Sequence, residues 1–236
     1  MKNSKGYYNA KVIAKFAEAL KNAKKLVKAM IESGNVPKVK FSESNTKMGA
    51  VSSVSTLPFI TCPFRCAETC GVSCYAAKLA NLRKNVMNAY AWNTALVMLC
   101  RDEFFRQINE YCRGVRYFRF HVSGDIVDYD YFNRMVEIAR NNPKTEILAF
   151  TKRFEVVNKW IDENGAFPEN LHILFSGWNN LKPINPHGMP ETTVYESEGE
   201  FNDNWKTCGG NCFNCACRGL GCWQAKTGDV IAFKKH

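Results

Sequence analysis

The chain has 236 residues, of which 46% are apolar, so it is long enough to bury one substantial core and too apolar to be disordered. It has no run of about 18 apolar residues and no apolar stretch at its N-terminus, which excludes a membrane span and a signal peptide and predicts a cytoplasmic protein with no membrane partner. The formal net charge of +10 makes a nucleic acid a conceivable partner.

Much of that positive charge lies in residues 1–47, which we expect to form a basic helical segment. Between Lys11 and Ser33, apolar residues recur at three- and four-residue steps with lysines between them, the pattern of an amphipathic helix. Gly34 predicts the end of this helix, and Pro37 follows at the expected distance. A helix that packs on a sheet, with its lysines in solvent, accounts for the pattern.

An N-terminal cysteine segment follows a predicted strand at 57–61 and a polar, turn-prone stretch at 38–55. Its cysteines recur every fourth residue. On one continuous helix, cysteines eight positions apart would be separated by about 12 Å, too far for all four sulfurs to meet. We therefore expect a loop from which a subset of the cysteines binds metal. The segment contains Cys62, Cys66, Cys70 and Cys74, and the expected ligands are Cys62, Cys70 and Cys74.

The middle of the chain alternates helix and strand patterns. Helical spacing runs from 75 to 93 and on to 112, and places Cys100 and Cys112 at packing positions. The later patterns predict strands at 116–122, 147–150, 172–175 and 192–195, with helices at 129–141 and 154–163. This alternation predicts an α/β fold with a parallel sheet that resembles part of a TIM barrel. We expect one domain over residues 1–236, with cysteine-rich loops at the strand C-terminal ends and a cysteine-rich segment, 201–236, packed on the domain.

Parallel sheets bind ligands beyond the C-terminal ends of their strands. His121 and Asp125 are candidate catalytic groups there, although His121 also suits a structural histidine and Asp125 a helix N-cap. Lys152 and Arg153 either bind an anion or are surface charges. The expected cofactor-binding residues are Ser123, Gly124, Asp125, Thr151, Lys152 and Ser176.

A C-terminal cysteine segment, Cys208 to Trp223, carries five cysteines among four glycines. In a reducing cytosol such closely spaced thiols favour metal over disulfides. Cys208-x3-Cys212-x2-Cys215 is the spacing that radical S-adenosylmethionine enzymes use for a [4Fe–4S] cluster. Cys217 or Cys222 is available as a fourth ligand, and the expected ligands are Cys208, Cys212, Cys215 and Cys222.

The irregular gaps favour an iron–sulfur cluster, with [4Fe–4S] expected, over zinc, which remains the alternative metal because four-cysteine zinc sites use similar pairs. One cluster shared by both cysteine segments and two separate clusters are equally compatible with the sequence. Whether one iron is open to a cofactor also stays undecided.

Several motifs together resemble the phage-associated "gene product 88" domain family over about residues 45–223. They are Thr61-Cys62-Pro63, Cys70-x3-Cys74-Tyr75-Ala76, Phe120 to Asp125, Thr151-Lys152-Arg153 and Cys212-x2-Cys215 with Cys222-Trp223. The resemblance implies a phage or prophage protein with cysteine-bound metal, made in an infected or lysogenic bacterial host. Cys66 and Cys217 look additional to the family pattern. A looser similarity to the radical S-adenosylmethionine superfamily implies S-adenosylmethionine as a further candidate cofactor at the strand ends.

The leading hypothesis is an iron–sulfur protein with redox or radical-type chemistry on an unknown substrate or redox partner. The alternative is a zinc-stabilised nucleic-acid-binding protein without catalysis. The net positive charge and the run of aromatic and basic residues at 116–120 support this alternative. A third interpretation is a structural module in which the metal only stabilises the fold and takes part in no reaction.

Overall fold

The computed structural model describes residues 6–178 and 180–234. These residues form one eight-stranded sheet of order β1-β2-β3-β4-β5-β6-β8-β7. All neighbouring strands are parallel except the antiparallel pair β1–β2. The strands are β1 (Phe41–Ser42), β2 (Ser52–Val54), β3 (Tyr117–Phe120), β4 (Glu146–Thr151), β5 (Leu171–Ser176), β6 (Glu191–Tyr195), β7 (Lys206–Thr207) and β8 (Val230–Lys234).

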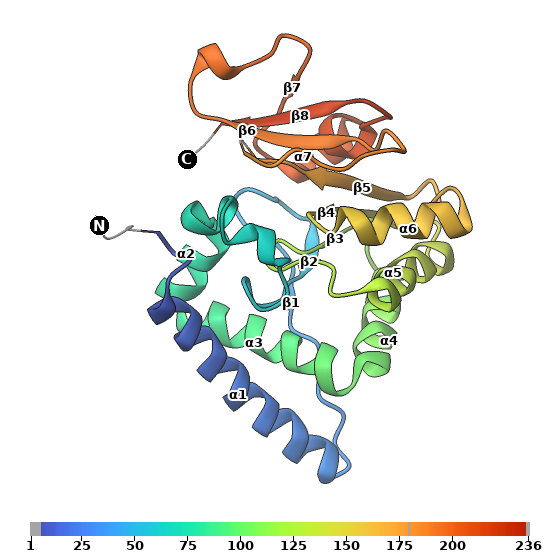
Figure 1. Ribbon diagram of the computed structural model, residues 1–236. Coiled ribbons are helices and arrows are strands. Elements are labelled where there is room, and N and C mark those ends of the chain that lie inside the picture. The colour runs from blue at the N-terminus through green and yellow to red at the C-terminus, as the bar shows by residue number, and fades with distance from the viewer. Residues whose placement is uncertain (1–5, 179, 235–236) are drawn as a thin grey trace.

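The expected α/β fold with a mostly parallel sheet is confirmed, whereas the sheet does not close into a barrel. Its edges are β1 and β7, which do not pair with each other. Six long helices lie in the chain before β6, and a short seventh follows β7 (Figure 1). They are α1 (Ala10–Glu32), α2 (Tyr75–Leu82), α3 (Lys84–Leu99), α4 (Arg101–Cys112), α5 (Tyr129–Asn141), α6 (Phe154–Asn164) and α7 (Cys212–Cys217).

Helix α1 begins and ends where the sequence predicts. The side chain of Asn9 caps it by accepting a hydrogen bond from the Val12 N–H at 3.0 Å. Gly34, with φ of 75°, takes the left-handed conformation just past its end. One stripe of the helix is buried, and the lysines occupy the remainder. The buried residues are Val12, Phe16, Leu20, Ala23 and Val27.

Both faces of the central strands are covered, because side chains of successive strand residues point to opposite faces. One face packs on α1 to α6 and forms the main core. The opposite face packs on the C-terminal segment around Trp223 and Phe213. The helix-side residues of the central strands include Phe118, Phe120, Ile147, Ala149, Ile173 and Phe175, and those of the opposite face include Tyr117, Leu148 and Leu174.

The C-terminal segment is held on the sheet by main-chain hydrogen bonds as well as by packing. The N–H of Cys212 donates to the Lys47 carbonyl at 3.1 Å, and that of Phe213 donates to the Met48 carbonyl at 3.0 Å. A Cβ at Gly49 would lie 2.7 Å from the Phe213 Cβ, so the two chains approach closely. The segment therefore forms a second, smaller layer across the sheet from the helices.

Two expectations about the elements before β3 were wrong. The segment 57–61, expected to be a strand, forms a turn instead. The strand in this part of the chain is β2, which lies a few residues earlier, inside the stretch 38–55 that was expected to be only polar and turn-prone. The long helical run breaks at Arg83 and at Cys100, both of which have extended or irregular backbone. Cys112 fills a fully buried core position, as expected, and Cys100 is half-buried against the same core.

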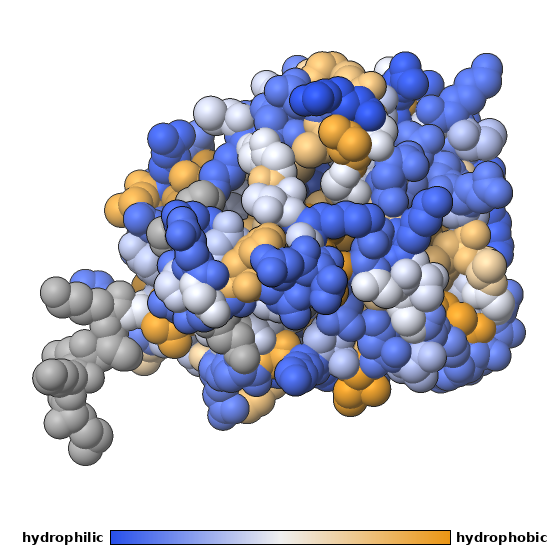
Figure 2. All heavy atoms as spheres, turned by 90° about the horizontal axis from the view of Figure 1, so that it is seen from above, coloured by the Kyte–Doolittle hydropathy of each residue, from blue (hydrophilic) through white to orange (hydrophobic). Residues whose placement is uncertain are grey.

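The face of the molecule seen from above is mainly hydrophilic (Figure 2). Seen from above, apolar side chains form scattered groups among polar and charged ones (Figure 2). Within residues 6–178 and 180–234, no helix has the length and apolar character that crossing a bilayer requires.

Candidate functional site

The four cysteines of the N-terminal segment converge in what we call the strand-end centre (Cys62, Cys66, Cys70 and Cys74). The chain forms two short 3-10 turns, Phe64–Cys66 and Cys70–Ser73, in place of the continuous helix that would separate the sulfurs. Cys66 is 4% exposed, and its thiol is in hydrogen-bond contact with the sulfurs of Cys62 and Cys70. Sequence reasoning had set Cys66 aside, yet it lies in the middle of the group.

Cys74 joins the same centre from the start of α2. Its sulfur caps that helix by accepting a hydrogen bond from the Ala77 N–H at 3.4 Å. Burial raises the pKa of Cys74 to about 12, and the negative charges of Cys62 and Cys70 contribute to the increase. The thiols thus oppose one another's ionisation, a repulsion that a bound metal cation would relieve.

Lys152 connects the strand-end centre to the sheet. The pKa of Cys70 is lowered, first by the hydrogen bond from Cys66 and also by the positive charge of Lys152. Lys152 follows β4, is 7% exposed, and donates from Nζ to the Ser176 Oγ at 2.6 Å. A buried cation beside a low-pKa thiol is an environment suited to bound anionic groups.

Asp125 organises the strand ends. Its carboxylate accepts hydrogen bonds from the Thr151 hydroxyl at 2.6 Å, the Lys152 N–H at 2.9 Å and the Ile126 N–H at 2.7 Å. Burial raises the pKa of Asp125, and these hydrogen bonds and the Lys152 charge oppose the increase. The alternative of a helix cap is wrong, because Asp128 caps α5. Asp125 instead fixes the ends of β3 and β4 relative to each other.

The same network reaches the first cysteine through threonines. The Asp125 N–H donates to the Thr61 hydroxyl at 3.3 Å, and that hydroxyl lies 2.9 Å from the Thr56 Oγ1. Thr61 immediately precedes Cys62. The polar strand ends and the strand-end centre therefore form one continuous site, which the sequence assigned to two separate motifs.

Gly124 allows the backbone after β3 to pack closely against the side chains of Thr56 and Thr61. It has φ of 84°, and an added Cβ would lie 2.0 Å from the Thr56 Oγ1 and 2.6 Å from the Thr61 Oγ1. Gly165 also has positive φ, 81°, but has open space around it. We expect Gly165→Ala to cost about 1–3 kcal/mol from backbone strain, and Gly124→Ala to cost about 1–3 kcal/mol more from overpacking. Urea denaturation of both variants measures the difference, and equal losses would contradict the close contact.

His121 is a neutral structural partner at the end of β3. Its Nε2 lies 3.0 Å from the Tyr131 hydroxyl, and its backbone is left-handed with φ of 58°. Burial, with a contribution from Arg119, lowers the pKa of His121 to about 3. Asp125 directs its oxygens elsewhere and forms no hydrogen bond to His121 within the described residues. At neutral pH this histidine has no extra proton to donate.

The depressed pKa of His121 predicts acid instability. Its folded pKa is about 3 and its unfolded pKa is about 6.5, so between these values the unfolded chain binds more protons. The stability it contributes is complete above pH 6.5 and is lost as the pH falls toward 3, by about 1.4 kcal/mol per pH unit. His121→Asn, which tolerates the left-handed backbone, should flatten the pH dependence of unfolding in this window; unchanged curves would refute this.

The C-terminal cysteines form a second group, the C-terminal centre (Cys208, Cys212, Cys215 and Cys222). Burial raises the pKa of Cys222 to about 12, and the charges of the other three thiols add to the increase. Cys217 is exposed and takes no part in these interactions. A Cβ at Gly209 would lie 3.0 Å from the Cys215 Sγ, so the absence of a side chain at Gly209 leaves space for this sulfur.

This centre lies over the sheet face and not only at the strand ends, which corrects the sequence-based expectation. Its thiols pack on the smaller core beside Trp223, whose indole N–H donates to the Cys212 carbonyl at 3.0 Å. Arg119, on β3, reaches across the same face. Its Nη1 lies 3.8 Å from the Cys212 Sγ, and its guanidinium lies 4.5 Å from the centre of the Phe150 ring.

All eleven cysteines are free thiols. Within the described part of the chain, no three His, Cys, Asp or Glu side chains are positioned to share a single metal ion. A cluster of several irons holds its thiolates farther apart than one ion does. Each centre gathers four soft sulfur donors of the kind that iron–sulfur clusters and zinc select. The type of donor, though not a preformed single-metal geometry, therefore matches cysteine-bound metal.

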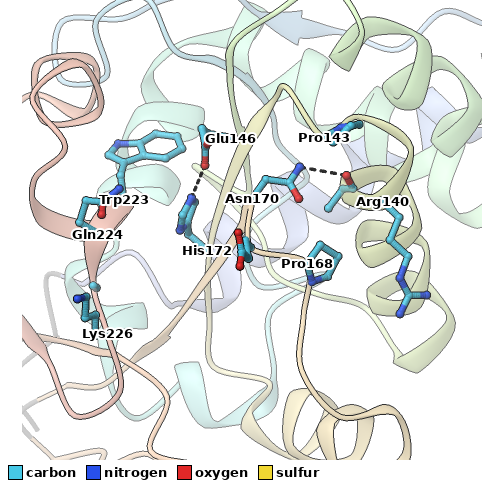
Figure 3. Close-up of a pocket in the computed structure, with 12 residues that line it drawn as sticks. Arg140, Pro143, Glu146, Pro168, Asn170, His172, Trp223, Gln224 and Lys226 are labelled. Carbon is cyan, nitrogen blue, oxygen red and sulfur yellow. Dashed lines mark hydrogen bonds and ion pairs between the residues drawn. The ribbon is translucent and has the colours of Figure 1, made fainter.

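A cavity of about 920 Å³ lies at the opposite end of the strands, near the starts of β4 and β5 (Figure 3). His172 and Glu146 face each other across 2.6 Å in it, with Trp223 beside them. It is lined by neither the cysteines nor the strand-end residues. The cavity borders the C-terminal segment through Trp223, but no thiol lines it, and the strand ends remain the candidate site.

The predicted strand-end residues are brought together by the parallel strands. Ser123 is 3% exposed with its hydroxyl unpartnered in the described chain, while Thr151, Lys152 and Ser176 form the network around Asp125. The sequence analysis gave no role at the strand ends to Thr56, Thr61 or Arg119, although Thr61 belongs to the family motif and Arg119 to the aromatic–basic run. The first two precede the cysteines in ordinary turn sequence, and Arg119 looked like one charge in an alternating strand.

Comparison with known proteins supports a single assignment. No curated protein and no solved structure matches the chain, and similarity to radical S-adenosylmethionine proteins gains no support. One family model, described as gene product 88, matches residues 10–195. The match includes the strand-end centre and the network of Asp125 and Lys152, and it ends before the C-terminal centre. With most of its length matched, the chain belongs to the gene product 88 family.

Proposed function

We propose that this protein is an iron–sulfur redox protein whose strand-end centre holds a [4Fe–4S] cluster, a type that four thiolates can bind, beside a ligand-binding strand edge. The observation that carries the proposal is the convergence of four thiols next to Lys152 and Asp125 at the ends of parallel strands. Ligands bind at such strand ends in other parallel sheets.

Cys62, Cys66, Cys70 and Cys74 would hold the cluster, which when bound supplies one-electron chemistry. If three thiolates bind, one iron is left for a further ligand; if all four bind, the cluster is an electron carrier. The strand-end residues then differ in their tasks. Asp125 keeps the strand ends in place, and Lys152 supplies a buried positive charge.

The strand edge suits a ligand that carries both a carboxylate and hydroxyl groups. Lys152 offers an ammonium group, and Ser176 and Ser123 offer hydroxyls, of which the Ser123 Oγ is buried and unpartnered within the described chain. S-adenosylmethionine has this combination of groups and is the cofactor that we propose for a radical-type reaction.

Anaerobic purification tests the proposal. We expect a brown protein whose visible absorption bleaches on reduction, with iron and acid-labile sulfide. Cys62→Ala/Cys70→Ala should lose the iron of the strand-end centre, whereas Cys100→Ala, a half-buried cysteine outside both centres, should retain it. A colourless protein with zinc alone would overturn the proposal and favour the zinc-stabilised nucleic-acid-binding alternative.

Binding of S-adenosylmethionine is a separate measurement. Calorimetry on the iron-loaded protein should show binding that Lys152→Met abolishes, and chemical reduction should then cleave the cofactor. A loaded protein that neither binds nor cleaves it would be an electron carrier, and the radical-type reaction would be wrong.

A further inference from the structure

We propose that the groove between α1 and α3 binds single-stranded nucleic acid, DNA or RNA. The proposal does not depend on the iron–sulfur function above, because neither a cysteine nor a strand-end residue lines the groove. It also differs from the zinc-stabilised alternative, whose support is the aromatic–basic run 116–120. The rings of that run cannot stack on bases, because Tyr117, Phe118 and Phe120 are all buried.

Most of the excess positive charge of the chain lies on the helices that form this groove. Residues 10–32 and 75–99, which include α1 to α3, contain nine lysines and arginines but only two acidic residues, a net charge of +7 out of +10 for the whole chain. Apart from Lys15 and Lys21, the lysines of α1 form no hydrogen bond or ion pair with another described residue. The acids of these helices therefore leave a positive surface that attracts phosphate groups.

The groove offers space beside these charges. It has a volume of about 440 Å³ and lies between α1 and α3, which run side by side on the part of the molecule away from the C-terminal segment (Figure 1). Ala23 and Met87, both buried, form part of its apolar lining. Helix α1 contributes Lys15 and helix α3 contributes Lys84. A ligand in the groove would therefore meet a cation on each of the two helices.

Lys15 is fixed at one end of the groove. Its Nζ donates to the Asn81 carbonyl at 2.6 Å and to the Asn81 Oδ1 at 3.0 Å. A second hollow, of about 680 Å³, is lined by Lys15 and also by Lys11, and it extends toward the start of α1. From Lys11 to Leu26, which lines the groove at its other end, the helix rises about 22 Å. This length suits an extended strand of several nucleotides with its phosphates beside the lysines.

Trp92 provides the groove with an aromatic ring on which a base can stack. The ring is half-buried and lines the groove. Its Nε1 donates to the Lys38 carbonyl at 2.7 Å, which fixes the ring, and the Lys40 Nζ lies 5.6 Å from the ring centre. Single-strand binders combine such rings with cations along the backbone of the nucleic acid. Asn22 and Asn88 also line the groove and offer donors and acceptors to the edges of bases.

Neither a duplex nor a membrane suits this groove. The bases of a duplex are stacked on one another, so a ring at the bottom of a groove cannot reach their faces. A basic amphipathic helix binds a membrane by burying its apolar face in the lipid. In α1 that face is already packed in the protein core, where Phe16 and Val27 are fully buried. The charges and the ring together fit an unpaired strand.

Fluorescence anisotropy on the full-length protein tests the proposal, with labelled oligothymidylate and oligouridylate of about 15 nucleotides as the DNA and RNA probes. We expect at least one of them to bind, and the logarithm of the affinity to fall with the logarithm of the salt concentration by about 0.7 per phosphate contact. A duplex of the same length, and vesicles of equal parts phosphatidylcholine and phosphatidylglycerol, should bind more weakly. Absence of binding to both oligonucleotides, or a preference for the duplex or the vesicles, would overturn the proposal.

Two charge reversals locate the site. Lys84→Glu should lower the affinity about 10-fold and make the salt dependence shallower by about one phosphate contact. Lys84 is exposed at the first position of α3, where an acid favours the helix, so this variant should fold. Lys144→Glu, the matched control, changes the net charge equally in an exposed turn before β4 and should leave the affinity nearly unchanged. Equal losses in the two variants would show attraction by net charge alone and would overturn the groove as the site.

The stacking role of Trp92 has its own pair of variants. Trp92→Leu should lower the affinity about 10-fold, the effect of losing one stacked base, while Trp92→Phe keeps a ring and should retain most of the affinity. Circular dichroism checks that both variants fold. An unchanged affinity in folded Trp92→Leu, or equal losses in the leucine and phenylalanine variants, would contradict stacking in the groove.

Discussion

Cys215→Ala is expected to abolish metal binding at the C-terminal centre, whereas Cys217→Ala, two residues away, leaves it intact. The Cys215 thiol interacts with those of Cys208 and Cys212, while Cys217 is exposed and outside the group. Removing one of four thiolates leaves too few donors for a closed four-ligand site. Metal analysis of both variants, normalised to protein, measures the effect.

The two cysteine variants form a matched pair because both lie on α7. Equal metal loss in the two would show that the helix itself, and not the sulfur of Cys215, maintains the centre. Full metal retention in Cys215→Ala would remove that cysteine from the ligand set.

Asp125→Ala is expected to destabilise the fold by about 3–5 kcal/mol, the cost of removing one partner from a buried ionic network. Its carboxylate accepts from Thr151 and Lys152 and faces the buried Lys152 charge. Asp125→Asn keeps the shape and should cost less. Urea denaturation provides the free energies of unfolding.

The control for Asp125 is an acid that forms an ion pair in solvent. Asp102 lies 2.7 Å from Arg134, but its side chain is 89% exposed, and exposed pairs contribute only about 0–1 kcal/mol. A loss in Asp125→Ala no larger than that in Asp102→Ala would mean that the strand-end network does not hold the strands together.

The elements with strong periodicity could be predicted from the sequence. Helix α1 has an uninterrupted buried stripe, α5 lies at its predicted bounds, and β3 to β6 each follow a clear turn signal. Strand β2 could not be predicted, because three residues that include two buried serines show neither alternation nor an apolar run. Strands β7 and β8 depend on tertiary pairing: β8 inserts between β6 and β7.

The part of the candidate site that follows from the order of parallel strands could be predicted from the sequence. Parallel strands bring their C-terminal ends to one edge, so Asp125, Lys152 and Ser176 were expected together. The role of Cys66 was not predictable, because the argument from helix length fails when the chain folds into two short turns. Arg119 was missed because its position depends on which face of β3 the C-terminal segment covers.

The central claim is that thiols from this chain hold iron in clusters beside a parallel sheet. Mössbauer spectroscopy of protein made anaerobically with isotope-enriched iron tests it most directly. We predict that cluster iron, coordinated by sulfur, accounts for most of the bound metal. A protein that binds no such iron and carries zinc alone, or whose cysteines prove to be paired as disulfides, would contradict the claim.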